Sequence, residues 1–188
     1  MTWWKTPESI VKKLKNDGCE VTIENMVEHL NDIAGIRIIC SFMSDIYPIA
    51  DMIARQADIT VLHVKDYIKY PKTNGYKSYH MVVTIPVYLS EGKRDTKVEI
   101  QIRTIAMDFW ASLEHKIAYK FEGKAPDYLE RELKSCADMV DMLDMKMFSL
   151  NQAIMAVEEE ERRVEEEKRR EREKAEKRQE ELAGNGPT

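Results

Sequence analysis

The 188-residue chain contains few cysteines and no long apolar run. Its three cysteines, Cys19, Cys40 and Cys136, lie far apart and form no Cys-x-x-Cys pair, which argues against a zinc ribbon or a thioredoxin-type motif. No apolar stretch approaches the length of a membrane-spanning helix, and the first residues do not resemble a signal peptide. We therefore expect a cytoplasmic protein without membrane contact.

The sequence also lacks a strong excess of charge of one sign. It has 29 basic and 34 acidic residues, which give a net charge of −5. This balance argues against attraction of nucleic acid to the whole surface, although it permits a local basic cleft. The hydrophobic content of 43% and the chain length fit one globular domain with an appendage.

Hydrophobic periodicity predicts both helices and strands in the first two thirds of the chain. Helices are expected over residues 6–18, 22–35, 45–56 and 106–121, and strands over residues 36–42, 59–68, 79–89 and 96–104. This order does not alternate strictly between strand and helix, so it differs from a doubly wound parallel fold. It predicts an α+β protein in which helices flank a mixed sheet.

From Leu133 onward, apolar residues recur at heptad spacing. This pattern predicts a long helix that either binds a partner or packs on its own domain, and the sequence favours the two equally. Charged residues at i,i+4 spacing then predict a solvated helix. The expected division is a domain over 1–130, a helical oligomerisation and charged segment over 131–182, and disorder over 183–188. The heptad positions are Leu133, Val140, Met147 and Ile154, with Cys136, Leu143, Leu150 and Val157.

The strand at 96–104 carries polar residues at alternate positions. Glu99, Gln101 and Arg103 share one face because side chains alternate with a period of two. Such a polar face is usually exposed to solvent without any further role. When helices cover the opposite face of the sheet, however, the polar face can form a cleft. Asp32, at the end of a predicted helix, supplies a second carboxylate. Two carboxylates that leave room for substrate phosphates suit Mg²⁺.

The sequence "NGYKSYH" brings several polar groups together after a predicted Asn74-Gly75 turn. A tyrosine ring at position 76 can stack on a purine, with its hydroxyl of secondary importance. Lys77 and His80 can contact phosphates, and Ser78 can add a hydroxyl contact. Each residue alone has an ordinary surface explanation, but the group indicates a nucleotide site.

Four ordered motifs, "DIAGIR", "NGYKSYH", "VEIQIRT" and "AMDFWASLEHKIAYK", resemble the synthetase domain of RelA/SpoT-type alarmone synthetases. The likeness covers roughly Lys5 to Tyr128 and is similar to the small, RelQ-like members. It implies transfer of the β,γ-pyrophosphate of ATP to the ribose 3′-hydroxyl of GDP or GTP, without hydrolase activity. It also implies a five-stranded, nucleotidyltransferase-like sheet and a homotetramer.

The same resemblance assigns roles to individual residues. Asp32 and Glu99 would bind Mg²⁺, and Glu99 would also act as the base toward the 3′-hydroxyl. Tyr76 would stack on the acceptor guanine. On the ATP side the resemblance places Lys5, Ser9, Lys13 and Arg37, and on the GTP or GDP side it adds Lys77, His80 and Gln101.

One position departs from the family pattern. An Arg-x-Lys sequence normally precedes the segment "TPESI", but Trp3 occupies the arginine position here, and the family's preceding helical segment is absent. This departure is explained either by an altered, weakened ATP site or by a chain that begins too late. The alternative is a degenerate synthetase that acts as a guanine-nucleotide-, alarmone- or RNA-binding regulator. Single-stranded RNA is a further expected partner, as a regulator of the protein. Intact Asp32 and Glu99 argue against that alternative, because a retired active site has no chemical need for both.

Overall fold

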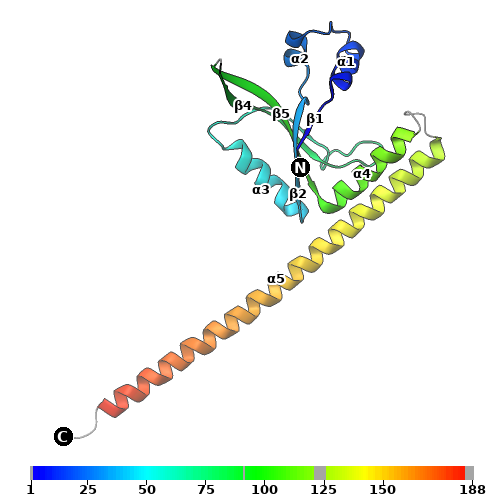
Figure 1. The fold of residues 1–188 in the computed structure, drawn as a ribbon. Helices are drawn as coiled ribbons and strands as arrows, with labels where there is room; N and C mark the ends of the chain where they lie inside the picture. Colours follow the sequence, from blue (N-terminus) through cyan, green and yellow to red (C-terminus); the bar gives the residue numbers. More distant parts are fainter. Residues whose placement is uncertain (1, 91, 121–125, 185–188) are drawn as a thin grey trace. The chain divides into compact units, whose positions relative to one another are not determined.

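The computed structural model describes residues 2–90, 92–120 and 126–184 (Figure 1). It contains two compact units, residues 1–145 and 146–188. In chain order the elements are β1 (Thr2–Trp4), α1 (Pro7–Asn16), α2 (Ile23–His29), β2 (Ala34–Cys40), α3 (Met43–Ala54), β3 (Thr60–Asp66), β4 (Tyr79–Leu89), β5 (Gly92–Thr104), α4 (Ile105–Lys120) and α5 (Asp127–Gly184).

The first unit is built on a five-stranded sheet with the order β1-β2-β5-β4-β3. Strands β2 and β5 are parallel and the other neighbours are antiparallel, so the predicted mixed sheet is confirmed. Strand β1 was not predicted, because three residues are too few to show a periodic pattern. It pairs with β2 and places Trp3 opposite Gly35.

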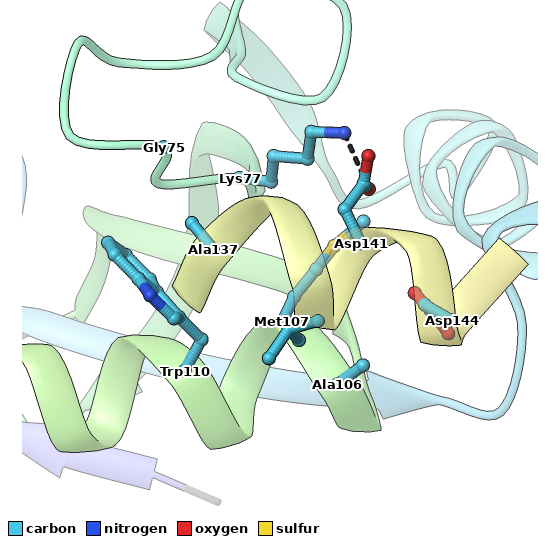
Figure 2. A pocket seen from close by; sticks show the side chains of 9 residues that line it. Gly75, Lys77, Ala106, Met107, Trp110, Ala137, Asp141 and Asp144 are labelled. Atoms are coloured by element: carbon cyan, nitrogen blue, oxygen red, sulfur yellow. Dashed lines mark hydrogen bonds and ion pairs between the residues drawn. The ribbon is translucent and has the colours of Figure 1, made fainter. Parts of the chain in front are cut away.

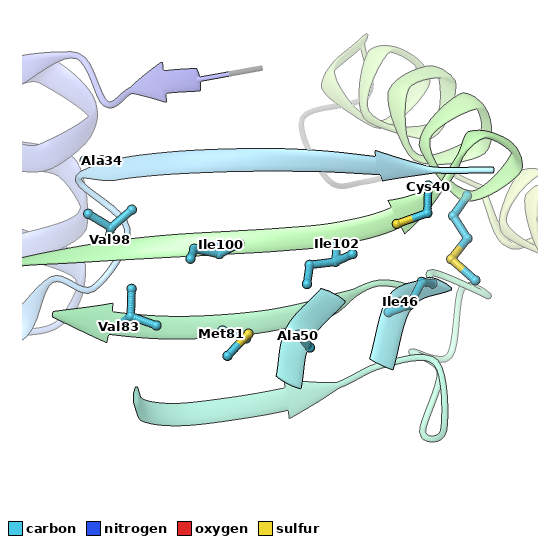
Figure 3. Close-up of a cluster of buried hydrophobic side chains, with 10 residues drawn as sticks. Ala34, Cys40, Ile46, Ala50, Met81, Val83, Val98, Ile100 and Ile102 are labelled. Carbon is cyan, nitrogen blue, oxygen red and sulfur yellow. The ribbon is translucent and has the colours of Figure 1, made fainter. Parts of the chain in front are cut away.

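One face of the sheet forms the apolar core (Figure 3). Alternate residues of β5, including Ile100 and Ile102, meet Met81 of β4 and are covered by Ile46 and Ala50 of α3. Ile46 and Ile102 are fully buried. Burying a side chain of this size stabilises the fold by about 1.5–3 kcal/mol. Because α3 covers this face, the polar residues of β5 must point to the other one.

Two capped helices lie next to each other before β2 (Figure 1). The Thr6 hydroxyl accepts a hydrogen bond from the Ser9 amide, and the Thr22 hydroxyl accepts one from the Asn25 amide. These bonds satisfy amide groups that a helix start leaves without partners. The Thr6 cap fixes where α1 begins and thereby places Lys13 within reach of Asp32, just before β2.

Helix α5 begins within the first unit and continues into the second. Its residues Ala137 and Asp144 are buried, and Val140 is partly buried, so this face packs on the first unit. The unit therefore extends past residue 130, the predicted end of the domain. Other apolar residues of the heptad pattern are exposed: Leu143, Met147, Leu150, Ile154 and Val157. Packing on the chain's own domain is thus confirmed for part of the helix, and partner binding by the exposed residues stays a prediction.

The last part of α5 is a charged helix, as predicted. Its ion pairs include Arg170 with Glu166 and Arg163 with Glu160. The helix continues through Gly184, so it includes residues 183 and 184 of the segment predicted to be disordered. Residues 185–188 lie outside the described part of the chain. Within that described part, no helix is both long and apolar enough to cross a bilayer.

Candidate active site

The polar face of the sheet carries a cleft of about 580 Å³. In the strand register, Glu99 of β5 lies beside Gly35 of β2, and Gln101 lies between Arg37 of β2 and His80 of β4. A space of this size suits a small-molecule ligand. Its lining includes Trp3, Arg37, Lys72, Tyr76, Gln101 and Arg103.

Glu99 is held by two side chains of this face. His80 Nδ1 lies 2.9 Å from Glu99 Oε1, and the Gln101 amide donates to Glu99 Oε2 at 3.0 Å. Burial alone would raise the pKa of Glu99, but the bonds from His80 and Gln101 lower it below its ordinary value. The negative charge of Asp32 acts in the opposite direction, so the two carboxylates lie within electrostatic reach of each other.

Arg103 connects the strand to the loop at residues 74–78. Its guanidinium donates to the Tyr76 hydroxyl at 2.6 Å, to Gln101 Oε1 at 2.9 Å and to Ser78 Oγ at 3.2 Å. It also donates to Asp108 of α4 at 3.2 Å. Arg103 is 5% exposed, so these bonds compensate a charge that water does not solvate. Ser78 is fully buried and serves this network, not a ligand.

The Tyr76 hydroxyl has a larger part than the sequence predicted. It accepts from Arg103 and lies 2.8 Å from His80 Nε2. Burial raises the pKa of Tyr76, so the phenol keeps the proton that it donates to His80. With the His80 proton on Nδ1, a chain of hydrogen bonds runs from Arg103 through Tyr76 and His80 to Glu99. The hydroxyl therefore helps to orient the site, and its smaller role in binding guanine stays a prediction.

Cations already surround the Tyr76 ring. Lys72 Nζ lies 4.9 Å and Arg103 Cζ 5.1 Å from the ring centroid. Tyr67 meets the same ring edge-on, with centroids 5.8 Å apart. Because Lys72 is exposed and Arg103 is buried, a base that stacks on Tyr76 would replace Lys72. Guanine stacking stays a prediction.

Asp32 forms ion pairs with both lysines that were predicted to bind ATP. Lys5 Nζ lies 2.7 Å from Asp32 Oδ2, and Lys13 donates to both carboxylate oxygens at 2.9 Å. Although burial opposes ionisation, the two lysines lower the pKa of Asp32. Burial also opposes the charge of Lys13, yet Asp32 raises the pKa of Lys13 above its ordinary value. Two cations are thus concentrated beside one carboxylate.

The remaining predicted residues differ in their placement. Arg37 lines the cleft, where its Nη1 pairs with Asp108 at 3.2 Å. Ser9 is exposed on α1, one helical turn before Lys13 and on the same face. Lys77 is not brought to Glu99 or His80, because its ammonium group pairs with Asp141 of α5 at 2.6 Å. A direct contact between Lys77 and the acceptor nucleotide stays a prediction.

The donor set at Asp32 and Glu99 fits Mg²⁺. Both carboxylates are held in the ionised form, and Mg²⁺ in nucleotide sites takes one or two carboxylates together with substrate phosphates. Among the residues that the structure describes, no group of three or more His, Cys, Asp or Glu side chains converges on one point.

Two residues of the network were not named from the sequence as site residues. Arg103 had a recognisable signal, because it continues the alternating polar face of Glu99 and Gln101. Asp108 had none, since an acidic residue in the first turn of a helix is common for reasons of the helix dipole. Its contacts with Arg37 and Arg103 depend on how α4 packs against the sheet.

The chain matches the family model "Region found in RelA / SpoT proteins" over residues 3–124. It is 51% identical over 150 residues to GTP pyrophosphokinase YwaC of Bacillus subtilis, covering 80% of this chain and 71% of that protein.

Two solved B. subtilis structures are also similar. Small alarmone synthetase 2 has a TM-score of 0.75 and 48% identity, covering 81% of this chain and 79% of that one. Small alarmone synthetase 1 bound to its product pppGpp has a TM-score of 0.76 and 35% identity, covering 81% and 77%. The fold, the polar cleft and these likenesses agree, and the chain belongs to the RelA/SpoT family.

Proposed function

We propose that this chain is a GTP pyrophosphokinase that transfers the β,γ-pyrophosphate of ATP to the 3′-hydroxyl of GDP or GTP. In this reaction the ribose O3′ forms a bond to the β-phosphorus, the bond from that phosphorus to the AMP oxygen breaks, and ppGpp or pppGpp results. The observation that carries the proposal is Glu99, an ionised carboxylate that is bonded to His80 beside the Tyr76 hydroxyl and that lies within electrostatic reach of Asp32, which holds two lysines. The relatives named above support it.

The acceptor nucleotide is assigned to the Tyr76 side of the cleft. The ring offers a face for guanine, and the Arg103–Tyr76–His80 chain fixes both the ring and Glu99 before substrate binds. Glu99 would receive the hydrogen bond, and then the proton, of the 3′-hydroxyl. Its lowered pKa makes it a weak base at neutral pH, but phosphoryl transfer depends mainly on positioning and electrostatics. Glu99 therefore acts chiefly by orienting the hydroxyl in line with the phosphate.

The donor nucleotide is assigned to the Asp32 side. Lys5 and Lys13 would turn from Asp32 toward the ATP phosphates, with Ser9 and Arg37 nearby on α1 and β2. Mg²⁺ held by Asp32 and Glu99 would neutralise phosphate charge when it is bound with ATP. Since both substrates are cytoplasmic nucleotides, we also propose this compartment for the protein.

The direct experiment is to incubate the protein with Mg²⁺, ATP labelled at its β- or γ-phosphorus, and either GDP or GTP, and to separate the products. Labelled ppGpp or pppGpp together with equimolar AMP is expected. No alarmone, with guanine-nucleotide binding retained, would overturn the proposal and favour a binding regulator instead. Incubating the product with the protein alone checks that it is not hydrolysed.

Substitutions at Tyr76 separate the ring from the hydroxyl. Tyr76→Ala should weaken acceptor use by about 1–3 kcal/mol more than Tyr76→Phe does, the usual scale for lost base–aromatic stacking. Tyr76→Phe keeps the ring but removes a partner from Arg103 and His80, and should cost about 1 kcal/mol. Steady-state kinetics with GDP and GTP measure both. Equal losses for the two variants would show that the ring has no role in binding.

We also propose a homo-oligomer, a tetramer by resemblance, that uses the exposed apolar face of α5. Leu143 is 60% and Leu150 50% exposed, in a helix where further Met, Ile and Val side chains are exposed. Contiguous exposed apolar area of this kind usually marks an interface. The double variant Leu143→Glu/Leu150→Glu should lower the mass measured by light scattering, whereas Lys168→Glu in the charged segment should not. A folded double variant of unchanged mass would place the interface elsewhere.

A further inference from the structure

The loop that carries Tyr76 rests directly on helix α5 (Figure 2). Gly75 has a φ of +88° and approaches α5 so closely that a Cβ atom there would clash with the Cβ of Ala137. A Cβ atom at position 75 would also lie only 3.1 Å from the Lys134 side chain. Glycine is therefore needed at position 75 both for its backbone conformation and for its contact with the helix.

An ion pair holds the other side of the same loop. Lys77 and Asp141 point toward each other, with Nζ 2.6 Å from Oδ1 (Figure 2). Their side chains are only 23% and 28% exposed, so the pair is less screened by solvent than the surface pairs farther along α5. Residue 78 is fully buried, so this loop has little room to shift. Helix α5 thus contacts the residue before Tyr76, Gly75, and the residue after it, Lys77.

The part of α5 that holds the loop is itself fixed to the sheet and to α4. The Trp110 indole donates to the Leu133 carbonyl at 3.1 Å. The Thr104 hydroxyl donates to Asp144 Oδ2 at 2.7 Å, and both residues are buried. Between loop, α4 and α5 there remains a cavity of about 20 Å³, room for roughly one water. A displacement of this part of α5 would therefore also displace the loop.

We propose that Ala137 and Asp141 of α5 are positioning residues that preset the acceptor-base loop, so that α5 controls acceptor affinity without touching the nucleotide. This inference rests on the proposed function, because it assumes that Tyr76 receives the acceptor base. A loop held in its binding conformation loses less entropy when the base binds. The donor side, built from Lys5, Lys13 and Asp32, shares none of these contacts.

The test compares Asp141→Asn with the charge-exchanged variant Lys77→Asp/Asp141→Lys. Glu132→Gln, which removes one carboxylate from an exposed position of the same helix, is the matched control. Asp141→Asn should raise KM for GDP about tenfold while KM for ATP stays within about twofold. The exchanged pair should recover most of that loss, and the control should behave as the unaltered chain. Thermal unfolding verifies that each variant is folded.

A second measurement does not depend on catalysis. Without nucleotide, hydrogen exchange of a peptide covering residues 72–78 should be faster in Asp141→Asn than in the unaltered chain and should slow again in the exchanged pair. Unchanged exchange in Asp141→Asn, equal loss of GDP and ATP use, or no recovery in the exchanged pair would overturn the inference. If the unaltered chain makes no alarmone but the exchange pattern appears, the proposed function fails while the hold of α5 on the loop stands.

Discussion

Glu99→Gln is expected to lower the rate of alarmone synthesis by about a thousandfold or more. The amide keeps the shape of the side chain and still accepts a hydrogen bond from His80. It removes the negative charge that would hold Mg²⁺ and the oxygen that would take the proton of the 3′-hydroxyl. Phosphoryl transfer depends mainly on positioning and on charge stabilisation, and one charged group at such a site is worth about 10³–10⁵-fold. The loss should appear in kcat at saturating ATP and GDP.

Two controls make this result specific. Glu24→Gln changes an exposed glutamate of α2 that has no part in the cleft, and should leave the rate unchanged. A titration with Mg²⁺ separates the two roles, because a variant that lost only metal affinity would recover at high Mg²⁺. Full turnover of Glu99→Gln at saturating Mg²⁺ would remove Glu99 from both roles.

The predictable parts of the site depend on residues close together in the sequence, above all on the alternation of polar and apolar residues along β5. Glu99, Gln101 and Arg103 follow one another at a spacing of two, and the apolar residues between them predict which face is buried. The Asn74-Gly75 turn and the helix caps are likewise local, because each depends on a few adjacent residues. These features predicted the sheet, its polar face and the loop beside it.

The parts that were missed depend on contacts between distant residues. Lysine is a residue type that often binds phosphate, and this suggested a nucleotide contact for Lys77. In the structure Lys77 pairs with Asp141, which lies 64 residues away on a helix that the sequence suggested for oligomerisation. The Tyr76 hydroxyl is bonded to Arg103, 27 residues away. No periodic pattern encodes which of several polar residues will meet across the fold. Tertiary packing decided whether each side chain faces the cleft or supports it.

Helix α5 would connect the proposed oligomer to acceptor binding, because it both holds the Tyr76 loop and has exposed apolar side chains. One face holds the Tyr76 loop through Ala137 and Asp141, and other positions of the helix, such as Met142 and Leu143, are exposed and apolar. A partner bound to the exposed positions would restrict the same helical segment that holds the loop. The Leu143→Glu/Leu150→Glu variant should therefore be assayed for KM of GDP as well as for mass.

Trp3→Arg is expected to raise the rate of alarmone synthesis by about a thousandfold, the scale of one cation at a phosphoryl-transfer transition state. Trp3 lines the cleft, where its ring lies against Gly35 and the Arg37 guanidinium is 5.6 Å from its centroid. The indole offers one N–H donor and no charge, whereas arginine offers a charged fork that matches phosphate oxygens. The family resemblance places arginine at this position.

Trp4→Arg is the matched control for this substitution. Trp4 is the next residue of β1, so its side chain points to the opposite face of the strand, where it is 76% exposed. Adding the same charge there should leave kcat and the KM for ATP unchanged, and this separates a contact with ATP from a general effect of positive charge. If the unaltered chain already turns over as fast as Trp3→Arg, the ATP phosphates are held by other cations. Lys5, Lys13 and Arg37 are then the ones to substitute, because two of them lie on Asp32 and the third lies beside the Trp3 ring.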